Sequence, residues 1–191
     1  MKEFNEVFDD LYHPNPNINI NASIYIKRYW QQEGIERLLY NLEEVDVYKR
    51  RKSVKALASF GLIALKPVSK NFLDTNNLIR RVSCLKVLVK IVSLSDLSHI
   101  PESLLLVIED AMQDQNEQIS LSLISILRNL DLFGLDYLKE ICMEKNILRS
   151  KAAITAISEI NEPEVKEFLK SIYLNNETDL FIKEAIKDCL I

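Results

Sequence analysis

The stretch Asp46-Val47-Tyr48-Lys49-Arg50-Arg51 decides the fold of this chain. It is a turn with an Asp that runs into a helix, because apolar or small residues follow at helical spacing at Val54, Leu57 and Ala58. Gly61 stands where a left-handed residue would stop such a helix. We therefore expect a helix that starts near residue 46 and stops before Gly61.

The same pattern, an Asn- or Asp-rich turn that leads into an apolar or small stripe, recurs five more times. It is found at residues 17–22, 77–81, 116–119, 146–149 and 179–183. The anchors near positions 18, 49, 79, 119, 148 and 181 are 31, 30, 40, 29 and 33 residues apart. A period of about 30 to 45 residues is typical of helical solenoids.

The repeats predict an all-α fold, a right-handed α-α superhelix (HEAT-like solenoid) of about six helix pairs. We expect a single domain over residues 1–191, in which each pair has an outer helix and an inner one. The inner helices are predicted to start near residues 17, 46, 77, 116, 146 and 179. Because a helix pair cannot bury its apolar face alone, stacked pairs share a core and expose a long surface for binding.

The interval of 40 residues contains an insertion at 93–101, between the third inner helix and the fourth outer helix. Long connections in compact domains are often functional. The insertion is therefore either a hinge or functional loop, or a longer connection with no role of its own.

Composition narrows the class of protein. Only 3 Gly and 5 Pro occur in 191 residues, which disfavours tight hairpins and phosphate-binding loops. Cys84, Cys142 and Cys189 form no CxxC pair, so neither a disulfide framework nor a thiolate zinc site is expected. The N-terminus is acidic and polar, and no apolar run approaches the roughly 20 residues of a membrane span. We expect a soluble, cytoplasmic protein.

Catalytic patterns are scarce. The two histidines, His13 and His99, lie in turn-like sequence and have no convincing partner, and the cysteines lie in apolar stripes typical of buried thiols. The common nucleotide-binding, zinc-protease and hydrolase motifs do not occur. The sequence therefore predicts no catalytic residue, no metal ligand and no resident cofactor, and it leans away from an enzyme.

Charge is distributed unevenly along the chain. Residues 27–90 hold 14 Lys or Arg against 6 Asp or Glu, a local charge of +8, so the remainder carries −12 within a total of −4. Arg50, Arg51, Arg80 and Arg81, at matching places in successive inner helices, predict a row of cations, to which Lys52 adds, for an anionic partner or pigment. The alternative is that these arginines form structural pairs with acids of adjoining repeats.

Aromatic residues gather beside this basic region. Tyr29 and Trp30 are adjacent, so they cannot both face the same side of a helix, and Tyr48 starts the second inner helix. Each is either packed in the core or exposed as a contact for a planar ligand or a protein.

Three segments resemble a known group of proteins. They are HPNPNIN at residues 13–19, GIERLL at 34–39 leading into YKRRKSVKALASFG at 48–61, and NLIRRVSC at 77–84. They are similar to the cyanobacterial HEAT-repeat proteins related to phycobilin lyases and the phycobilisome-degradation protein. The resemblance spans most of the chain and is strongest over residues 13–92. It departs at Lys49, where the repeat normally has Val, and in the fourth repeat, which lacks the usual Arg.

The resemblance implies a role with phycobiliproteins and bilins. Of three interpretations we favour a protein-binding scaffold or chaperone-like factor in chromophorylation or phycobilisome turnover, with a phycobiliprotein as partner and a bilin bound at most transiently. The second is a subunit of a bilin lyase. The third is a nucleic-acid-binding solenoid, which the acidic pI of about 5.4 disfavours.

Overall fold

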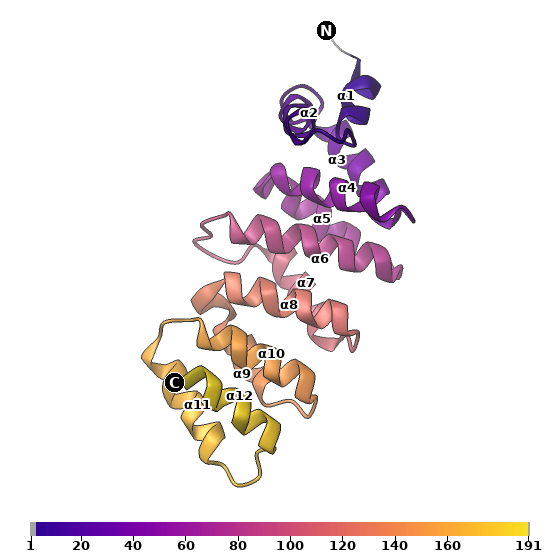
Figure 1. The fold of residues 1–191 in the computed structure, drawn as a ribbon. Helices are drawn as coiled ribbons and strands as arrows, with labels where there is room; N and C mark the ends of the chain where they lie inside the picture. Colours follow the sequence, from indigo (N-terminus) through magenta and orange to yellow (C-terminus); the bar gives the residue numbers. More distant parts are fainter. Residues whose placement is uncertain (1–2, 191) are drawn as a thin grey trace. The chain divides into compact units, whose positions relative to one another are not determined.

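The computed structural model describes residues 3–190, which form twelve α-helices and two short 3-10 helices without a strand (Figure 1). Within this range the predicted all-α helical-repeat class is confirmed. The chain divides into two compact units, residues 3–96 with 101–110 and residues 97–100 with 111–190.

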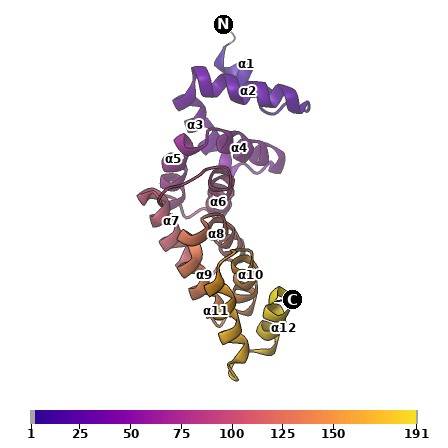
Figure 2. The ribbon, with the colours of Figure 1, turned by 90° about the vertical axis from the view of Figure 1, so that its left-hand side faces the viewer.

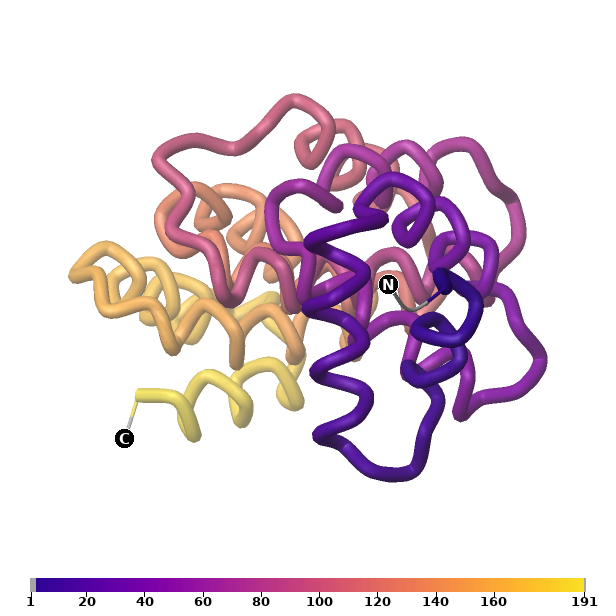
Figure 3. Tube along the Cα trace, turned by 90° about the horizontal axis from the view of Figure 1, so that it is seen from above, coloured from indigo at the N-terminus to yellow at the C-terminus, as the bar shows by residue number. Residues whose placement is uncertain are grey.

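The first unit contains the N-terminal helices. They are α1 (Phe4–Asp10), α2 (Pro16–Tyr29), α3 (Gln31–Tyr40), η1 (Asn41–Glu43), α4 (Val47–Ser59), α5 (Leu62–Leu73), α6 (Leu78–Ser93) and most of α7 (Glu102–Gln113). Helices α1 and α2 lie side by side (Figure 3). Helices α3 and η1 pack on α4, and α6 packs against both α4 and α5.

The second unit is built around one helix. Its elements are α8 (Glu117–Asn129), η2 (Asp131–Gly134), α9 (Leu135–Cys142), α10 (Ile147–Ser158), α11 (Pro163–Leu174) and α12 (Leu180–Leu190). Helix α10 packs against α8, α9, α11 and α12. Figure 2 shows α12 beside α10.

Asn and Asp side chains start the repeated helices. The N-caps of α2, α4, α6, α8 and α10, whose side chains accept hydrogen bonds from first-turn N–H groups, are Asn15, Asp46, Asn77, Asn116 and Asn146. Such caps satisfy donors that have no partner inside the helix, and each contributes about 1 kcal/mol. The helices accordingly begin at residues 16, 47, 78, 117 and 147.

Helix α4 has the predicted extent, but the glycine that follows it has a different conformation from the predicted one. Val54, Leu57 and Ala58 of α4 are buried, as their spacing predicts, whereas Val47 in the first turn is 46% exposed. Gly61 has φ +64° and ψ −143°, a region that glycine alone adopts readily, rather than the left-handed helical conformation that we predicted. It turns the chain directly into α5.

The predicted insertion corresponds to residues 94–101, which have no helical structure, since Ser93 is the last residue of α6. The side chain of Ser95 donates a hydrogen bond to the Ile91 carbonyl oxygen at 2.7 Å, so the link begins tied to the end of α6. None of the helices in residues 3–190 is long and apolar enough to cross a lipid bilayer.

Arg149 joins α10 to the preceding repeat inside the second unit. Its side chain is 4% exposed, and its guanidinium donates to the carbonyl oxygens of Met112 and Asp114, both at 3.3 Å. Its Nε lies 3.1 Å from a Glu144 carboxylate oxygen, off the line of a hydrogen bond. A buried arginine with these partners connects two successive repeats.

Candidate functional site

Arg50 and Arg51, adjacent in α4, have different surroundings. Arg50 is half-buried and donates a hydrogen bond to the Glu44 carbonyl oxygen in the turn before the helix. Arg51 is exposed, and its guanidinium makes no hydrogen bond or ion pair with any residue in the range 3–190. Counted from the N-caps of α4 and α6, Arg50 matches Arg81, but Arg51 matches the buried Val82. The capping residues therefore set a register in which the four predicted arginines are not two matching pairs.

The two arginines of α6 are paired with acids of the first unit. Arg80 Nη2 lies 2.5 Å from a carboxylate oxygen of Glu43. Arg81 Nη2 lies 2.5 Å from a carboxylate oxygen of Asp110, and its guanidinium lies 4.0 Å from the ring centroid of Phe72. These contacts are the structural alternative that the sequence left open. A role of Arg80 and Arg81 in binding a partner stays a prediction.

Two of the three predicted aromatic contacts, Tyr29 and Trp30, lie in one cluster at the end of α2. Trp30 is half-buried and lies 5.6 Å from the Phe4 ring and 5.4 Å from the Tyr25 ring, measured between centroids. Tyr29 is 48% exposed and lies 4.5 Å from Tyr25. The adjacent pair thus has one inner and one outer member, as the sequence implied.

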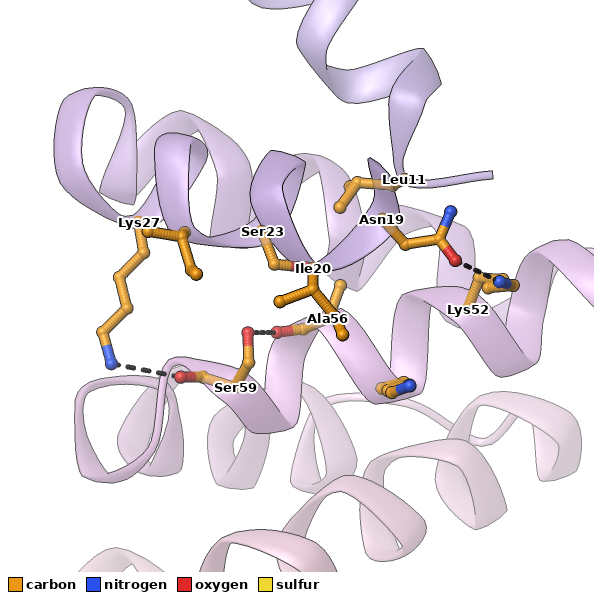
Figure 4. Close-up of a pocket in the computed structure, with 10 residues that line it drawn as sticks. Leu11, Asn19, Ile20, Ser23, Lys27, Lys52, Ala56 and Ser59 are labelled. Carbon is orange, nitrogen blue, oxygen red and sulfur yellow. Dashed lines mark hydrogen bonds between the residues drawn. The ribbon is translucent and has the colours of Figure 1, made fainter. Parts of the chain in front are cut away.

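A groove lies between α2 and α4, and lysines close it at both ends (Figure 4). At one end Lys27 Nζ donates to the carbonyl oxygen of Ser59 at 3.1 Å. At the other end Lys52 Nζ donates to the side-chain oxygen of Asn19. The two contacts hold the helices on either side of the groove and fix both ammonium groups at its rim.

Asn19 is the polar anchor of the groove. It is buried, and its amide nitrogen donates to the carbonyl oxygens of Asp10, at 3.1 Å, and His13. Its oxygen is therefore directed to Lys52, whose ammonium also lies 5.2 Å from the ring centroid of Tyr48. Tyr48, which we predicted as a contact residue, is half exposed beside this end of the groove.

The lining of the groove is mostly apolar. Leu11 and Ala56 are buried in it, whereas Ile20 and Ile24 are 46% and 60% exposed. These two isoleucines are four residues apart, so they form one row along α2. The volume is about 220 Å³, below the roughly 300–1,000 Å³ of pockets that enclose a whole small-molecule ligand. The groove has room for one or two side chains.

The groove is basic and contains no acid. Helices α2 and α4 together carry seven Lys or Arg and no Asp or Glu. Lys27, Lys52 and Lys55 line the groove, and none of them is paired with a carboxylate of residues 3–190. Lys49 and Arg50 lie in the first turn of α4, where the helix dipole disfavours cations. An anionic partner would neutralise this surface.

Only part of this surface could be predicted from the sequence. Lys52 was predicted as a site residue, whereas Lys27, Lys55 and the row of Ile20 and Ile24 were not. Isoleucines in a helix are usually assigned to the core, so nothing in their spacing marks them as exposed. The signal that could have found the groove is the lack of carboxylates in two helices of a chain with 28 Asp and Glu.

The thiols of Cys84 and Cys142 are buried. Burial raises the pKa of Cys84 to about 12, against the opposing charges of Arg80 and Arg81. Burial, with a smaller contribution from Cys189, raises the pKa of Cys142 to about 12. Both therefore stay as neutral thiols at neutral pH.

The histidines contact their own turns. His13 Nδ1 accepts a hydrogen bond from the N–H of Asn15 at 3.0 Å, and His99 Nδ1 lies 3.2 Å from the Ser98 hydroxyl. Among residues 3–190, no cluster of His, Cys, Asp and Glu is arranged to hold a metal ion.

Comparison with known proteins relates the chain to two cyanobacterial proteins. It is 24% identical over 179 residues to the uncharacterized phycocyanin operon protein Z of Pseudanabaena tenuis, covering 93% of this chain and 89% of the relative. It is 25% identical over 177 residues to the bilin biosynthesis protein CpeZ of a Synechococcus strain, covering 88% and 94%. No family model matches the chain. The predicted resemblance to cyanobacterial bilin-related proteins is confirmed by these homologues.

A solved structure of an engineered protein has a similar fold. It is 14% identical in sequence to this chain and superposes on it with a TM-score of 0.52. The superposition covers 100% of this chain and 96% of the engineered protein. This likeness concerns the fold alone.

Proposed function

We propose, starting from the relationship of this chain to CpeZ and phycocyanin operon protein Z, that it is a protein-binding helical-repeat scaffold in bilin chromophorylation. In this role it holds a phycobiliprotein subunit, or the complex that modifies it, while another protein forms the bond to the bilin. The names of both relatives support a bilin-related role. Their coverage of about nine-tenths of the chain supports extending that role to the whole repeat array.

The observation that carries the scaffold proposal is the groove between α2 and α4. It combines exposed apolar side chains with three lysines that lack a carboxylate partner in the described range. Apolar anchors surrounded by charge are typical of surfaces that bind proteins. We place the binding surface here, with Arg51 and Tyr48 at its border. Arg50, Arg80 and Arg81 are assigned to a supporting role, because each has a partner within the first unit.

A bilin is a less suitable primary ligand of this groove. A bilin carries two propionates that lysines could bind. Enclosing its rings, however, requires more space than about 220 Å³. We therefore propose that any bilin contact is transient and occurs while the pigment is attached to, or being attached to, the partner protein.

The test is reconstitution in a heterologous host that makes the bilin. A phycobiliprotein subunit and a bilin lyase are co-expressed with the chain, without it, or with the chain in place of the lyase. We expect the chain to co-purify with the subunit or the lyase. We also expect it to raise the yield of subunit with covalently attached bilin, measured by absorbance of the denatured protein, only when the lyase is present.

Each other outcome has a definite meaning. Attachment of bilin by the chain without a separate lyase would replace the scaffold proposal with the lyase interpretation. Absence of co-purification together with an unchanged yield would refute the proposed function. A matched pair of variants, Lys55→Glu in the groove and Lys86→Glu on α6, separates the groove from the general charge of the chain, since both lysines are exposed.

A further inference from the structure

We infer that the groove between α2 and α4 binds an acidic amphipathic helix of a partner protein. An aliphatic side chain of that helix enters the groove, and carboxylates on either side of it pair with Lys27, Lys52 and Lys55. This inference rests on the proposed protein-binding role and states the chemistry of the segment that is bound.

The shape of the groove favours a helix with a narrow apolar ridge. Its volume of about 220 Å³ accepts one or two side chains. Ile20 and Ile24 form a row along one side, and Ala56 on α4 leaves space on the other. Two helices pack when the side-chain ridge of one fits such a groove of the other, and helix-in-groove partners use apolar anchors three or four residues apart.

The charges select an acidic partner. Lys27 and Lys52 each donate to a neutral oxygen, of Ser59 and Asn19, and these bonds hold their ammonium groups at opposite ends of the groove. An ammonium group has three donors, so each can also bind a carboxylate. Lys55 lines the same groove and is exposed, and its ammonium group makes no hydrogen bond or ion pair with the described residues. Carboxylates flanking the apolar anchor would meet all three lysines.

Two other classes of anionic partner match the surface less well. Single-stranded nucleic acid is bound by aromatic rings on which bases stack, and the lining of this groove contains no aromatic residue. Helices that lie on a membrane insert a continuous apolar face into the lipid, whereas here the apolar lining is concave and lies between lysines. Anionic vesicles and single-stranded DNA therefore serve as comparison ligands.

The experiment measures binding of designed peptides to the full chain without pigment. The probe is a fluorescein-labelled peptide of about 18 residues, long enough to form a helix, with leucines every third or fourth position flanked by glutamates. One control peptide has lysine in place of each glutamate, and a second has glutamine in place of each leucine. Binding is followed by fluorescence anisotropy at low and high salt.

We expect saturable binding of the acidic peptide below about 1 mM, weakened by salt, and little binding of either control. Lys55→Glu should weaken it about tenfold, because one ion pair is lost and one repulsion is added. Ile24→Ser should weaken it by a similar factor of about ten, through lost apolar contact. Lys86→Glu on α6 and Leu121→Ser on α8, both at exposed positions, should leave it unchanged.

Circular dichroism of each variant checks that the fold is retained, which is expected because Ile24 and Lys55 are exposed. The inference is overturned if the acidic peptide does not bind, if all variants bind it equally, or if only vesicles or DNA respond to Lys55→Glu. The outcome of this experiment is independent of the reconstitution. Peptide binding together with unchanged bilin attachment would refute the role in bilin attachment alone. Increased bilin attachment without peptide binding would refute the acidic-helix partner alone.

Discussion

Replacing Arg149 with Ala should destabilise the second unit more than any other single charge deletion that we consider. The change removes a guanidinium that is 4% exposed and leaves the carbonyl oxygens of Met112 and Asp114 without these donors. It also leaves Glu144, whose side chain is 28% exposed, without its cation. Removing one partner of a buried pair costs 3–5 kcal/mol, and the partial exposure of Glu144 puts the expected loss at about 3 kcal/mol.

The assay is urea or thermal unfolding followed by circular dichroism. A loss of about 3 kcal/mol corresponds to a decrease in Tm of roughly 6–12 °C for a chain of this size. The matched control is Arg128→Ala. Its ion pair with Glu159, at 2.8 Å, is 43% and 53% exposed, so the expected cost is about 0.5 kcal/mol. If Arg149→Ala were as mild as Arg128→Ala, the assignment of Arg149 as a connection between repeats would be wrong.

The same pair predicts a pH dependence with a definite sign. Burial raises the pKa of Glu144 above its usual value, nearby Glu140 adds to the shift, and Arg149 opposes it. The folded state then binds a proton more tightly than the unfolded state, so stability falls as pH rises from the ordinary glutamate pKa through the raised one. Glu144→Gln should remove this slope, and Arg149→Ala should steepen it, as measured by urea midpoints across mildly acidic pH.

Two further predictions concern thiols and glycines. Because their pKa is about 12, Cys84 and Cys142 should react with a thiol reagent at pH 8 at least about a thousandfold more slowly than a free thiol. They should also react after the half-buried Cys189. Denaturant should equalise the three rates, and fast reaction of all three cysteines in the folded protein would contradict the burial. Gly134→Ala should cost about 3 kcal/mol in urea unfolding, because its Cβ would lie 2.0 Å from a main-chain oxygen of α8. Gly61→Ala should cost about 1–3 kcal/mol, through its positive φ alone, since open space surrounds its Cβ. A negligible cost at Gly134 would show that crowding is not what matters there.

The starts of the repeated helices could be predicted because the signal is local. Asp46 and Asn77 cap the helices that follow them with their own side chains, and such contacts depend on residues two or three positions away. The partners of Arg80 and Arg81 could not be predicted in the same way. Glu43 and Asp110 lie 37 and 29 positions from them, and only the packing of successive helices brings those groups together.

The positive charge of the groove could be predicted from the sequence, but its exposed apolar lining could not. The sequence shows the cations around Lys52, but the exposure of Ile20 and Ile24 depends on how far α2 lies from α4. That separation is set by the contacts of Asn19 and Lys27 with the facing helix, which are tertiary interactions. Apolar residues at helical spacing therefore predict burial correctly for Val54, Leu57 and Ala58 of α4 and incorrectly for Ile20 and Ile24 of α2.

Arg80 and Arg149 each reach out of their own repeat to an acceptor in the one before it, Glu43 in the first case and the end of α7 in the second. A segment that runs from one Asn- or Asp-rich interhelical turn to the next would contain the arginine but not its acceptor. Duplication or deletion of one such segment would leave an arginine without its acceptor at one junction, and carbonyl oxygens or a carboxylate without a donor at another. The segment that can be inherited intact is longer than the repeat that the sequence displays, and it includes the end of its predecessor.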